Sequence, residues 1–194
     1  SYTGDLRTLF EISNAKQANE RFLLAFAHRH PLNEELVKEF QRILTRGTYD
    51  ERRYRLGERP GEYKHHDYVT GRQEGGAAPE DVADEMHELL EELQDISKEN
   101  ALTAAAYFHP FADGNGRTGR LAMNYFLVLH EHPPITIHEE DRKEYYEALE
   151  TWDREQELQP MCQFLRGQTV KTWERQIVRM EKRKHMKQQE GIEK

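Results

Sequence analysis

The chain has 194 residues, with 36% hydrophobic and 33% charged side chains, which suits one domain or one domain with a small appendage. Its formal net charge of −8 argues against nucleic acid as a partner, because phosphate backbones need a basic face. No run of about 18 apolar residues and no signal-peptide pattern occurs, and the only cysteine is Cys162. We therefore expect a cytoplasmic protein with no membrane partner and no internal disulfide.

Helices dominate the first part of the chain. Apolar spacing predicts one helix over about 16–30 and a second that begins after Asn33, a favourable N-cap residue. The expected core face of the first helix consists of Phe22, Leu23, Phe26 and Ala27. That of the second consists of Leu36, Val37, Phe40, Ile43 and Leu44.

The next stretch, residues 54–79, contains glycines and prolines around Tyr68-Val69-Thr70, and this pattern predicts a loop with a short β-hairpin. A third helix is predicted over 80–98, with its many acidic residues on a solvated face.

Residues 101–108 are small and apolar, which is typical of a buried helix. After a glycine turn, the segment that ends near Leu129 is apolar nearly all round and predicts a helix in the centre of the core. Further helices are expected near 139–152, 160–166 and 168–189. The fold class is therefore all-α with one small β-hairpin, in three parts: an N-terminal helical segment over 1–30, a core domain over 31–167 and a C-terminal helix over 168–194.

The glycine turn lies in the stretch HPFADGNGRTGR, residues 109–120. Gly114, Asn115 and Gly116 allow a concave turn of backbone N–H groups, and the helix that follows adds the positive end of its dipole. Arg117 and Arg120 lie in the first turns of that helix, and a guanidinium group matches phosphate oxygens in pairs. Taken alone, such a turn is a helix connector, but the whole stretch predicts a polyphosphate site.

Two further side chains complete a reaction centre. Asp113 can hold Mg²⁺ against phosphate oxygens, and His109 can accept a proton near neutral pH. A base, a metal carboxylate, an anion-binding turn and two arginines are the parts that phosphoryl or nucleotidyl transfer needs.

The stretch resembles the signature HPFx[DE]GNGRxxR of the Fic family. Its fixed positions are all filled, by His109, Pro110, Phe111, Asp113, Gly114, Asn115, Gly116, Arg117 and Arg120. The likeness continues through PPITI at 133–137 and YYEALE at 145–150, and covers roughly residues 30 to 166. It implies a Fic-like helical bundle, with the Fic core in the domain over 31–167. The intact GNGR sequence distinguishes the chain from the kinase-like Doc branch.

The resemblance implies a protein adenylyltransferase, an enzyme that moves AMP from ATP to a Ser, Thr or Tyr hydroxyl of a target protein and releases pyrophosphate. His109 would be the base, and Asp113 would hold Mg²⁺. The GNGR turn and Arg120 would bind the phosphates of ATP, and Tyr145 and Tyr146 would lie near the adenine. The hairpin near Tyr63–Gly71 would be the flap along which the target docks by strand addition. A homodimer is the common default for such a chain.

Fic enzymes often carry an inhibitory glutamate on a helix with the pattern [ST]xxxE[GN]. The full match, at Thr70–Gly75 around Glu74, has too many glycines for a helix. A partial match at the end of the chain places Glu190 as a candidate, and a third expectation is that this element preceded Ser1.

Three alternatives stay open for the same site. It could remove AMP from a modified protein, it could use another nucleotide or a phosphocholine donor, or the chain could be a nucleotide-binding regulatory module with little turnover.

Overall fold

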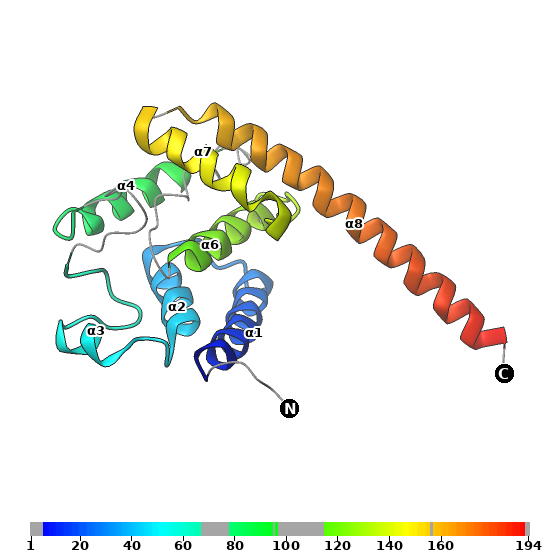
Figure 1. Ribbon diagram of the computed structural model, residues 1–194, viewed down its shortest axis with the longest axis horizontal. Coiled ribbons are helices and arrows are strands. Elements are labelled where there is room, and N and C mark those ends of the chain that lie inside the picture. The colour runs from blue at the N-terminus through cyan, green and yellow to red at the C-terminus, as the bar shows by residue number, and fades with distance from the viewer. Residues whose placement is uncertain (1–5, 67–77, 95, 97–114, 156, 193–194) are drawn as a thin grey trace. The chain divides into compact units, whose positions relative to one another are not determined.

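The computed structural model describes residues 6–66, 78–94, 96, 115–155 and 157–192 of the chain (Figure 1). These residues are mostly helical, and none of them lies in a strand. The helices are α1 (Leu6–Ala27), α2 (Glu34–Thr45), α3 (Glu51–Arg55), α4 (Val82–Gln94), α6 (Asn115–Leu129), the 3₁₀ helix η3 (Glu139–Asp141), α7 (Arg142–Glu155) and α8 (Gln159–Ile192). The helix expected over 101–108 lies outside the described residues.

Contacts divide the chain into two compact units, Ser1–His132 and Pro133–Lys194. The division falls at Pro133-Pro134, where a helix cannot continue. None of the helices that the structure describes is long and apolar enough to cross a membrane.

The core of the first unit is built by α1, α2 and α6, which pack against one another, with α4 against α2 (Figure 1). One aromatic side chain from each of the three central helices meets in the middle. The ring of Tyr125 on α6 lies 5.3 Å from that of Phe22 and 5.9 Å from that of Phe40, edge-on to both. Tyr125 is fully buried, which confirms the prediction that the helix after the glycine turn lies in the core.

Helix α1 begins at Leu6, ten residues before the predicted start, and its buried stripe is Asn14, Ala18, Phe22 and Ala25. The prediction that Leu23 faces the core is wrong, since its side chain is 55% exposed. The sequence pattern did not reveal the start of this stripe, because its first residue, Asn14, is polar. The amide of Asn14 donates to the carbonyls of Leu44 (3.3 Å) and Arg46 (2.8 Å), groups at the end of α2 that have no partner within that helix.

The predicted N-cap of α2 is confirmed, because Asn33 Oδ1 accepts the backbone N–H of Leu36 at 2.9 Å. After α2, two buried side chains hold the stretch that leads to residue 66. Gln41 accepts the N–H of Gly61, and the carboxylate of Glu58 accepts the N–H of His65 at 3.0 Å. The short helix α3 within this stretch was not predicted.

Only the beginning of the predicted hairpin lies among the described residues. Residues 67–77 lie outside the described part, and the stretch from Tyr63 to His66 forms no strand. Tyr63 is fixed on α2, since Lys38 Nζ lies 4.0 Å from the centre of its ring. Burial and the nearby carboxylate of Glu34 raise the pKa of Tyr63 above its ordinary value, so the phenol stays neutral there.

The second unit consists of η3, α7 and α8. Its core includes Ile135, Tyr145, Ala148, Met161, Cys162 and Leu165. The two helices expected over 160–166 and 168–189 are one continuous helix of 34 residues, and this part of the prediction is wrong. Gly167, which lies between the two expected helices, is inside α8, and a Cβ atom added there would have no other atom within 4 Å.

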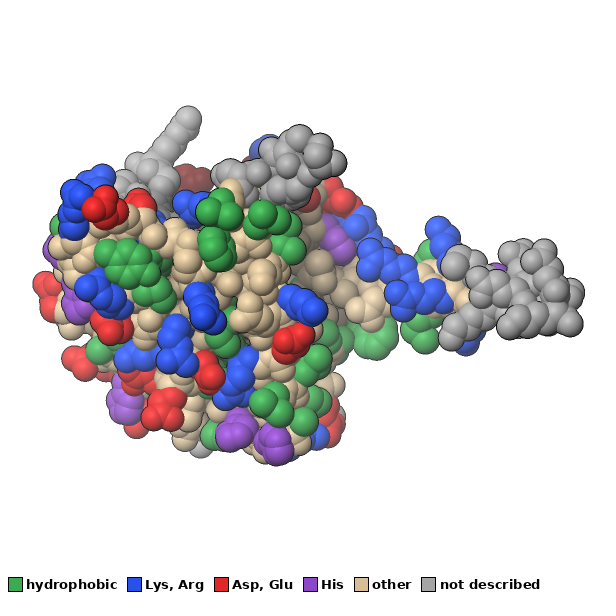
Figure 2. All heavy atoms as spheres, turned by 90° about the horizontal axis from the view of Figure 1, so that it is seen from below, with side chains coloured by type: hydrophobic (Ala, Val, Ile, Leu, Met, Phe, Trp, Pro, Cys, Tyr) green, Lys and Arg blue, Asp and Glu red, His purple; other side chains and the backbone are tan. Residues whose placement is uncertain are grey.

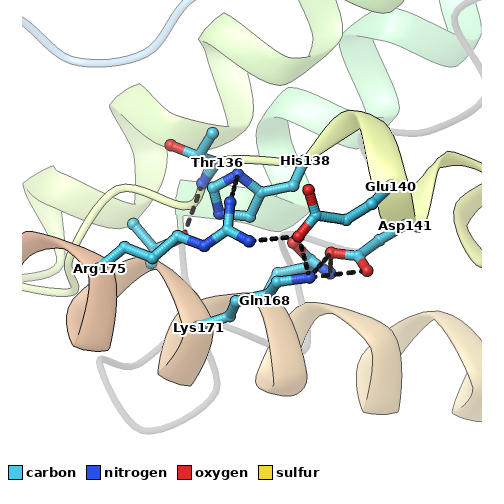
Figure 3. A network of polar contacts seen from close by, with 8 residues as sticks. Thr136, His138, Glu140, Asp141, Gln168, Lys171 and Arg175 are labelled. Atoms are coloured by element: carbon cyan, nitrogen blue, oxygen red, sulfur yellow. Dashed lines mark hydrogen bonds and ion pairs between the residues drawn. The ribbon is translucent and has the colours of Figure 1, made fainter.

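A charged network joins His138 and the 3₁₀ helix η3 to α8 (Figure 3). Lys171 Nζ lies 2.6 Å from Asp141 Oδ2 and 2.9 Å from Glu140 Oε1, and Gln168 donates to Asp141 at 2.8 Å. Arg175 pairs with Glu140 and contacts His138 Nδ1 at 3.1 Å. The hydrogen bonds from Lys171 hold the pKa values of both carboxyl groups below their ordinary range.

Candidate functional site

The described part of the HPFADGNGRTGR stretch is the beginning of α6. His109, Asp113 and Gly114 lie outside the described residues, and Asn115 is the first residue of the helix. Gly116, Arg117 and Arg120 follow in its first two turns. The first N–H groups of a helix have no partner within it and carry the positive end of the dipole, so this end attracts anions.

Arg120 folds back over the first turn of α6. A Cβ atom added at Gly116 would lie 3.3 Å from Arg120 Nη1, so the guanidinium group occupies the space that a larger residue would need. The absence of a side chain at Gly116 therefore lets a second positive group lie against the helix start, next to the backbone N–H groups.

Arg117 makes a contact that the sequence did not predict. Its Nη2 lies 3.4 Å from Oε1 of Glu11, and the two side chains are 28% and 33% exposed. The same carboxylate oxygen accepts from Nε of Arg7 at 3.2 Å. Helix α1 therefore supplies a carboxylate to the start of α6 and offsets part of the positive charge there.

Glu11 could not be found from a local pattern, because it is far from the motif in the sequence and fits no spacing with it. The only signal was the length of α1. Once the helix is extended back to Leu6, and since α1 packs against α6, a charged side chain one turn before Asn14 can reach the neighbouring helix.

The two tyrosines expected near the adenine belong to the second unit. Tyr145 is 6% exposed and packs on the ring of Phe164, with 5.7 Å between ring centres. Tyr146 is 52% exposed, and the guanidinium of Arg142 lies 5.7 Å from its ring centre. Tyr145 is thus a core residue of its unit and Tyr146 is an exposed one, while their contact with a nucleotide stays a prediction.

The side chain of Glu190, the candidate for the inhibitory glutamate, lies outside the described residues, although the backbone there belongs to α8. Glu74, in the full match that its glycines argue against, is also outside them. Among the described residues, no group of three or more His, Cys, Asp or Glu side chains could hold a metal ion. A magnesium site at Asp113 therefore stays a prediction.

The described residues fold like solved Fic domain proteins. A Fic domain containing signaling protein from Bacteroides thetaiotaomicron is similar with a TM-score of 0.72 and 24% identity, over 88% of this chain and 72% of that one. Fic-1 from C. elegans is similar with a TM-score of 0.75 and 22% identity, over 94% of this chain and 55% of that one. The architecture is thus that of a Fic domain.

Residues 31–127, half of the chain, match the Fic/DOC family, and the match includes the start of α6. This chain belongs to the Fic/DOC family. Proteins named protein adenylyltransferase Fic are similar over 66 residues, at 39% identity in Aedes aegypti and 42% in Nematostella vectensis. These matches cover 34% of this chain but only 13% and 15% of the two relatives.

Proposed function

We propose that this chain is a protein adenylyltransferase, which transfers AMP from ATP to a Ser, Thr or Tyr hydroxyl of a target protein. The observation that carries the proposal is the start of α6. There, within the matched family region, the guanidinium group of Arg120 lies over Gly116 and that of Arg117 lies on the same first turns. Two guanidinium groups at one helix N-terminus suit a polyphosphate better than a neutral ligand.

The phosphates would lie against the turn of Gly114, Asn115 and Gly116, with Arg117 and Arg120 at the β/γ end. This orientation leaves the α-phosphorus as the point of attack. His109 would take the proton of the target hydroxyl, whose oxygen would form the new bond to the α-phosphorus as the bond to the pyrophosphate oxygen breaks. A magnesium ion bound at Asp113 would offset negative charge on the phosphates.

The target segment would dock beside the stretch that begins at Tyr63. Support comes from the way this stretch is held on α2, by Tyr63 against Lys38 and by the hydrogen bond from Gly61 to Gln41. Anchoring this stretch on α2 suits a docking segment, because such a segment has to align an extended peptide by backbone hydrogen bonds.

The proposal is tested with labelled ATP, Mg²⁺ and a cell extract, by following the transfer of label to protein. Replacing His109 by Ala should lower the rate at least about a hundredfold, because the hydroxyl then loses its base. His87→Ala is the matched control, since His87 is exposed on α4, outside the motif, and pairs with Glu91 at 3.2 Å. Equal label transfer by both variants and the unchanged protein would contradict the role of His109.

Donor and direction can be separated in the same assay. Competition by unlabelled nucleotides and by a phosphocholine donor ranks the donors. The reverse reaction, removal of AMP from a modified protein, needs a carboxylate that positions water. Within the described part of the chain, Glu11 brings a carboxylate to the motif, at Arg117 rather than Arg120. Loss of label from a purified modified protein, abolished by Glu11→Gln, would favour that alternative.

A further inference from the structure

A groove with a volume of about 420 Å³ lies between α7 and α8 of the second unit. Each helix lines it with residues three or four positions apart, which share one face of a helix. From α7 these are Glu144, Glu147, Ala148 and Thr151, and from α8 they are Pro160, Gln163, Phe164, Gly167 and Gln168. The volume is that of a small-molecule site, which is typically about 300–1,000 Å³.

Small and apolar residues keep this groove open. Ala148 lines it from α7, and a Cβ atom added at Gly167 on α8 would have no other atom within 4 Å. Pro160 and Phe164 add apolar surface, and the ring of Phe164 is held against that of Tyr145, with 5.7 Å between ring centres. The groove can therefore take an aliphatic chain.

The charge of the groove is negative. Glu144 and Glu147 bring two carboxylates to it, and none of the described residues that line it is basic. Lys143 pairs with Glu147 at 3.4 Å from outside the groove, but it is 87% exposed, so this pair is weak. Figure 2 shows lysine and arginine side chains along the exposed end of α8, which lies beyond Gln168, the last residue of the groove. The groove therefore attracts cations rather than phosphates.

A buried hydrogen-bond acceptor in the wall of the groove lacks a donor. Gln168 is 4% exposed, and its Nε2 donates to Asp141 Oδ2 at 2.8 Å (Figure 3). Because a carboxylate only accepts hydrogen bonds, this contact fixes the amide with its nitrogen toward Asp141 and its oxygen away from it. That oxygen, Oε1, has no hydrogen-bond partner within the described part of the chain. Since buried acceptors nearly always have a donor, the groove suits a ligand that carries N–H groups.

We propose that the groove binds a linear aliphatic diamine or polyamine in its protonated form. Its ammonium groups match the carboxylates of Glu144 and Glu147, and one N–H donates to Oε1 of Gln168. Its methylene groups lie against the apolar surface of Ala148 and Phe164. An organic cation fits better than a metal ion, because no group of three or more His, Cys, Asp or Glu among the described residues could hold a metal. The site is independent of the proposed activity, because it contains no residue of the motif.

The first experiment titrates the whole chain with 1,4-diaminobutane by calorimetry. The salt concentration is about 0.15 M, which screens the general attraction of an acidic chain for cations. We expect a Kd of about 1 mM or lower. 1-Butylamine, with one ammonium group, should bind at least about fivefold more weakly, and the uncharged 1,4-butanediol should not bind. Equal affinity for the diamine and the monoamine, or no binding of the diamine at about 10 mM, would overturn the proposal.

The second experiment uses two matched glutamates of α7. Glu147 and Glu150 are 61% and 63% exposed, and each pairs with a basic residue four positions away, at 3.4 and 3.8 Å. Only Glu147 lines the groove. Glu147→Gln should weaken binding of the diamine at least about threefold, and Glu150→Gln by less than about 1.5-fold. Equal effects would mean that the diamine follows the overall charge of the helix and would overturn the site.

The third experiment fills the groove without changing its charge. Gly167→Leu places a side chain in the open space and should weaken binding at least about tenfold, because the methylene groups of the diamine lose their place. Arg166→Leu is the control, since Arg166 is the exposed neighbour of Gly167 and does not line the groove, and it should not weaken binding. Circular dichroism checks that both variants remain helical. Unchanged affinity in a folded Gly167→Leu variant would place the diamine elsewhere and overturn the proposal.

Discussion

At the scale of single residues, Arg117 and Glu11 share one ionic contact at the start of α6. Their side chains are only partly exposed, and the 3.4 Å contact occupies a guanidinium that would otherwise be open to phosphate oxygens. We expect Glu11→Gln to tighten ATP binding about threefold to tenfold, because it removes a negative charge that competes with the phosphates for Arg117. Calorimetric titration with ATP measures this change.

The control for that change is Glu20→Gln on the same helix. Glu20 pairs with Lys16 at 3.9 Å, and both side chains are largely exposed, so its loss should leave ATP affinity unchanged. Equal affinity for the Glu11 variant and the unchanged protein would mean that Arg117 does not contact the nucleotide.

Site residues that are neighbours along the chain could be predicted from the sequence. Residues that reach the site only through the packing of distant helices could not. Gly116, Arg117 and Arg120 are neighbours along the chain, and the helix start that holds them follows from the same few residues. Glu11 reaches the site from a distant helix, and only the packing of α1 on α6 brings it there. The burial of Tyr145 is also a result of packing, against Phe164.

At the scale of helices, α2 begins with a single capping contact. Asn33 accepts the N–H of Leu36 at 2.9 Å and so satisfies one of the first N–H groups of the helix. Asn33→Ala should lower the free energy of unfolding of the first unit by about 1 kcal/mol. Urea denaturation followed by far-ultraviolet circular dichroism measures the loss. Asn33→Asp keeps the acceptor and should restore most of the stability, and an equal loss in both variants would show that the cap contributes little.

Two glycines with open space around them should respond oppositely to alanine. Gly167 lies inside α8, and Gly57 has a φ of +85°, which disfavours any side chain. Gly167→Ala should stabilise the protein by about 0.5–1 kcal/mol, while Gly57→Ala should destabilise it by a similar amount or more. Urea denaturation of both variants provides the measurement. Destabilisation by Gly167→Ala would show that α8 needs flexibility at that point.

Helix positions were easier to predict than helix ends. The cap at Asn33 and the apolar row of α6 gave correct elements, since each depends on residues within one or two turns. The break expected at Gly167 does not occur because one glycine costs a helix only about 1 kcal/mol, and the buried stripe that continues to Thr172 outweighs it. Helix α1 extends further than predicted because a buried asparagine can belong to a core stripe when its amide has partners.

At the scale of the whole molecule, contacts divide the chain after His132, which is not a boundary of the expected parts over 1–30, 31–167 and 168–194. Those three parts were predicted as functional domains, and they stay a prediction. Both tryptophans, Trp152 and Trp173, lie in the second unit. Their fluorescence therefore reports the unfolding of that unit alone.

This probe suits a test of pH dependence. The hydrogen bonds to Asp141, first from Lys171 and then from Gln168, lower the pKa of that carboxyl group in the folded protein. Its contribution to stability is thus complete above the ordinary pKa of about 3.9 and is lost as pH falls through the lowered folded value. Asp141→Asn should melt at a lower temperature at neutral pH and lose less stability in acid.

Glu139→Gln serves as the control for this test. Glu139 is exposed and its carboxylate pairs with Arg142 at 3.0 Å, outside the network of Asp141, so this variant should keep the full acid sensitivity. An acid response in the Asp141 variant as steep as in the unchanged protein would place the acid-labile group elsewhere.

The continuity of α8 has a mechanical consequence. A helix of 34 residues is about 50 Å long and turns by about 100° for each residue. A residue inserted within it therefore rotates all later side chains about the helix axis by that angle. Inserting one alanine after Arg175, which pairs with Glu140, would turn the exposed apolar side chains beyond it, Ile177 and Met180, by that angle relative to the packed face of α8, whereas inserting seven would bring them back nearly into phase. The direction in which these two side chains point is therefore set by the number of residues between them and the packed part of α8.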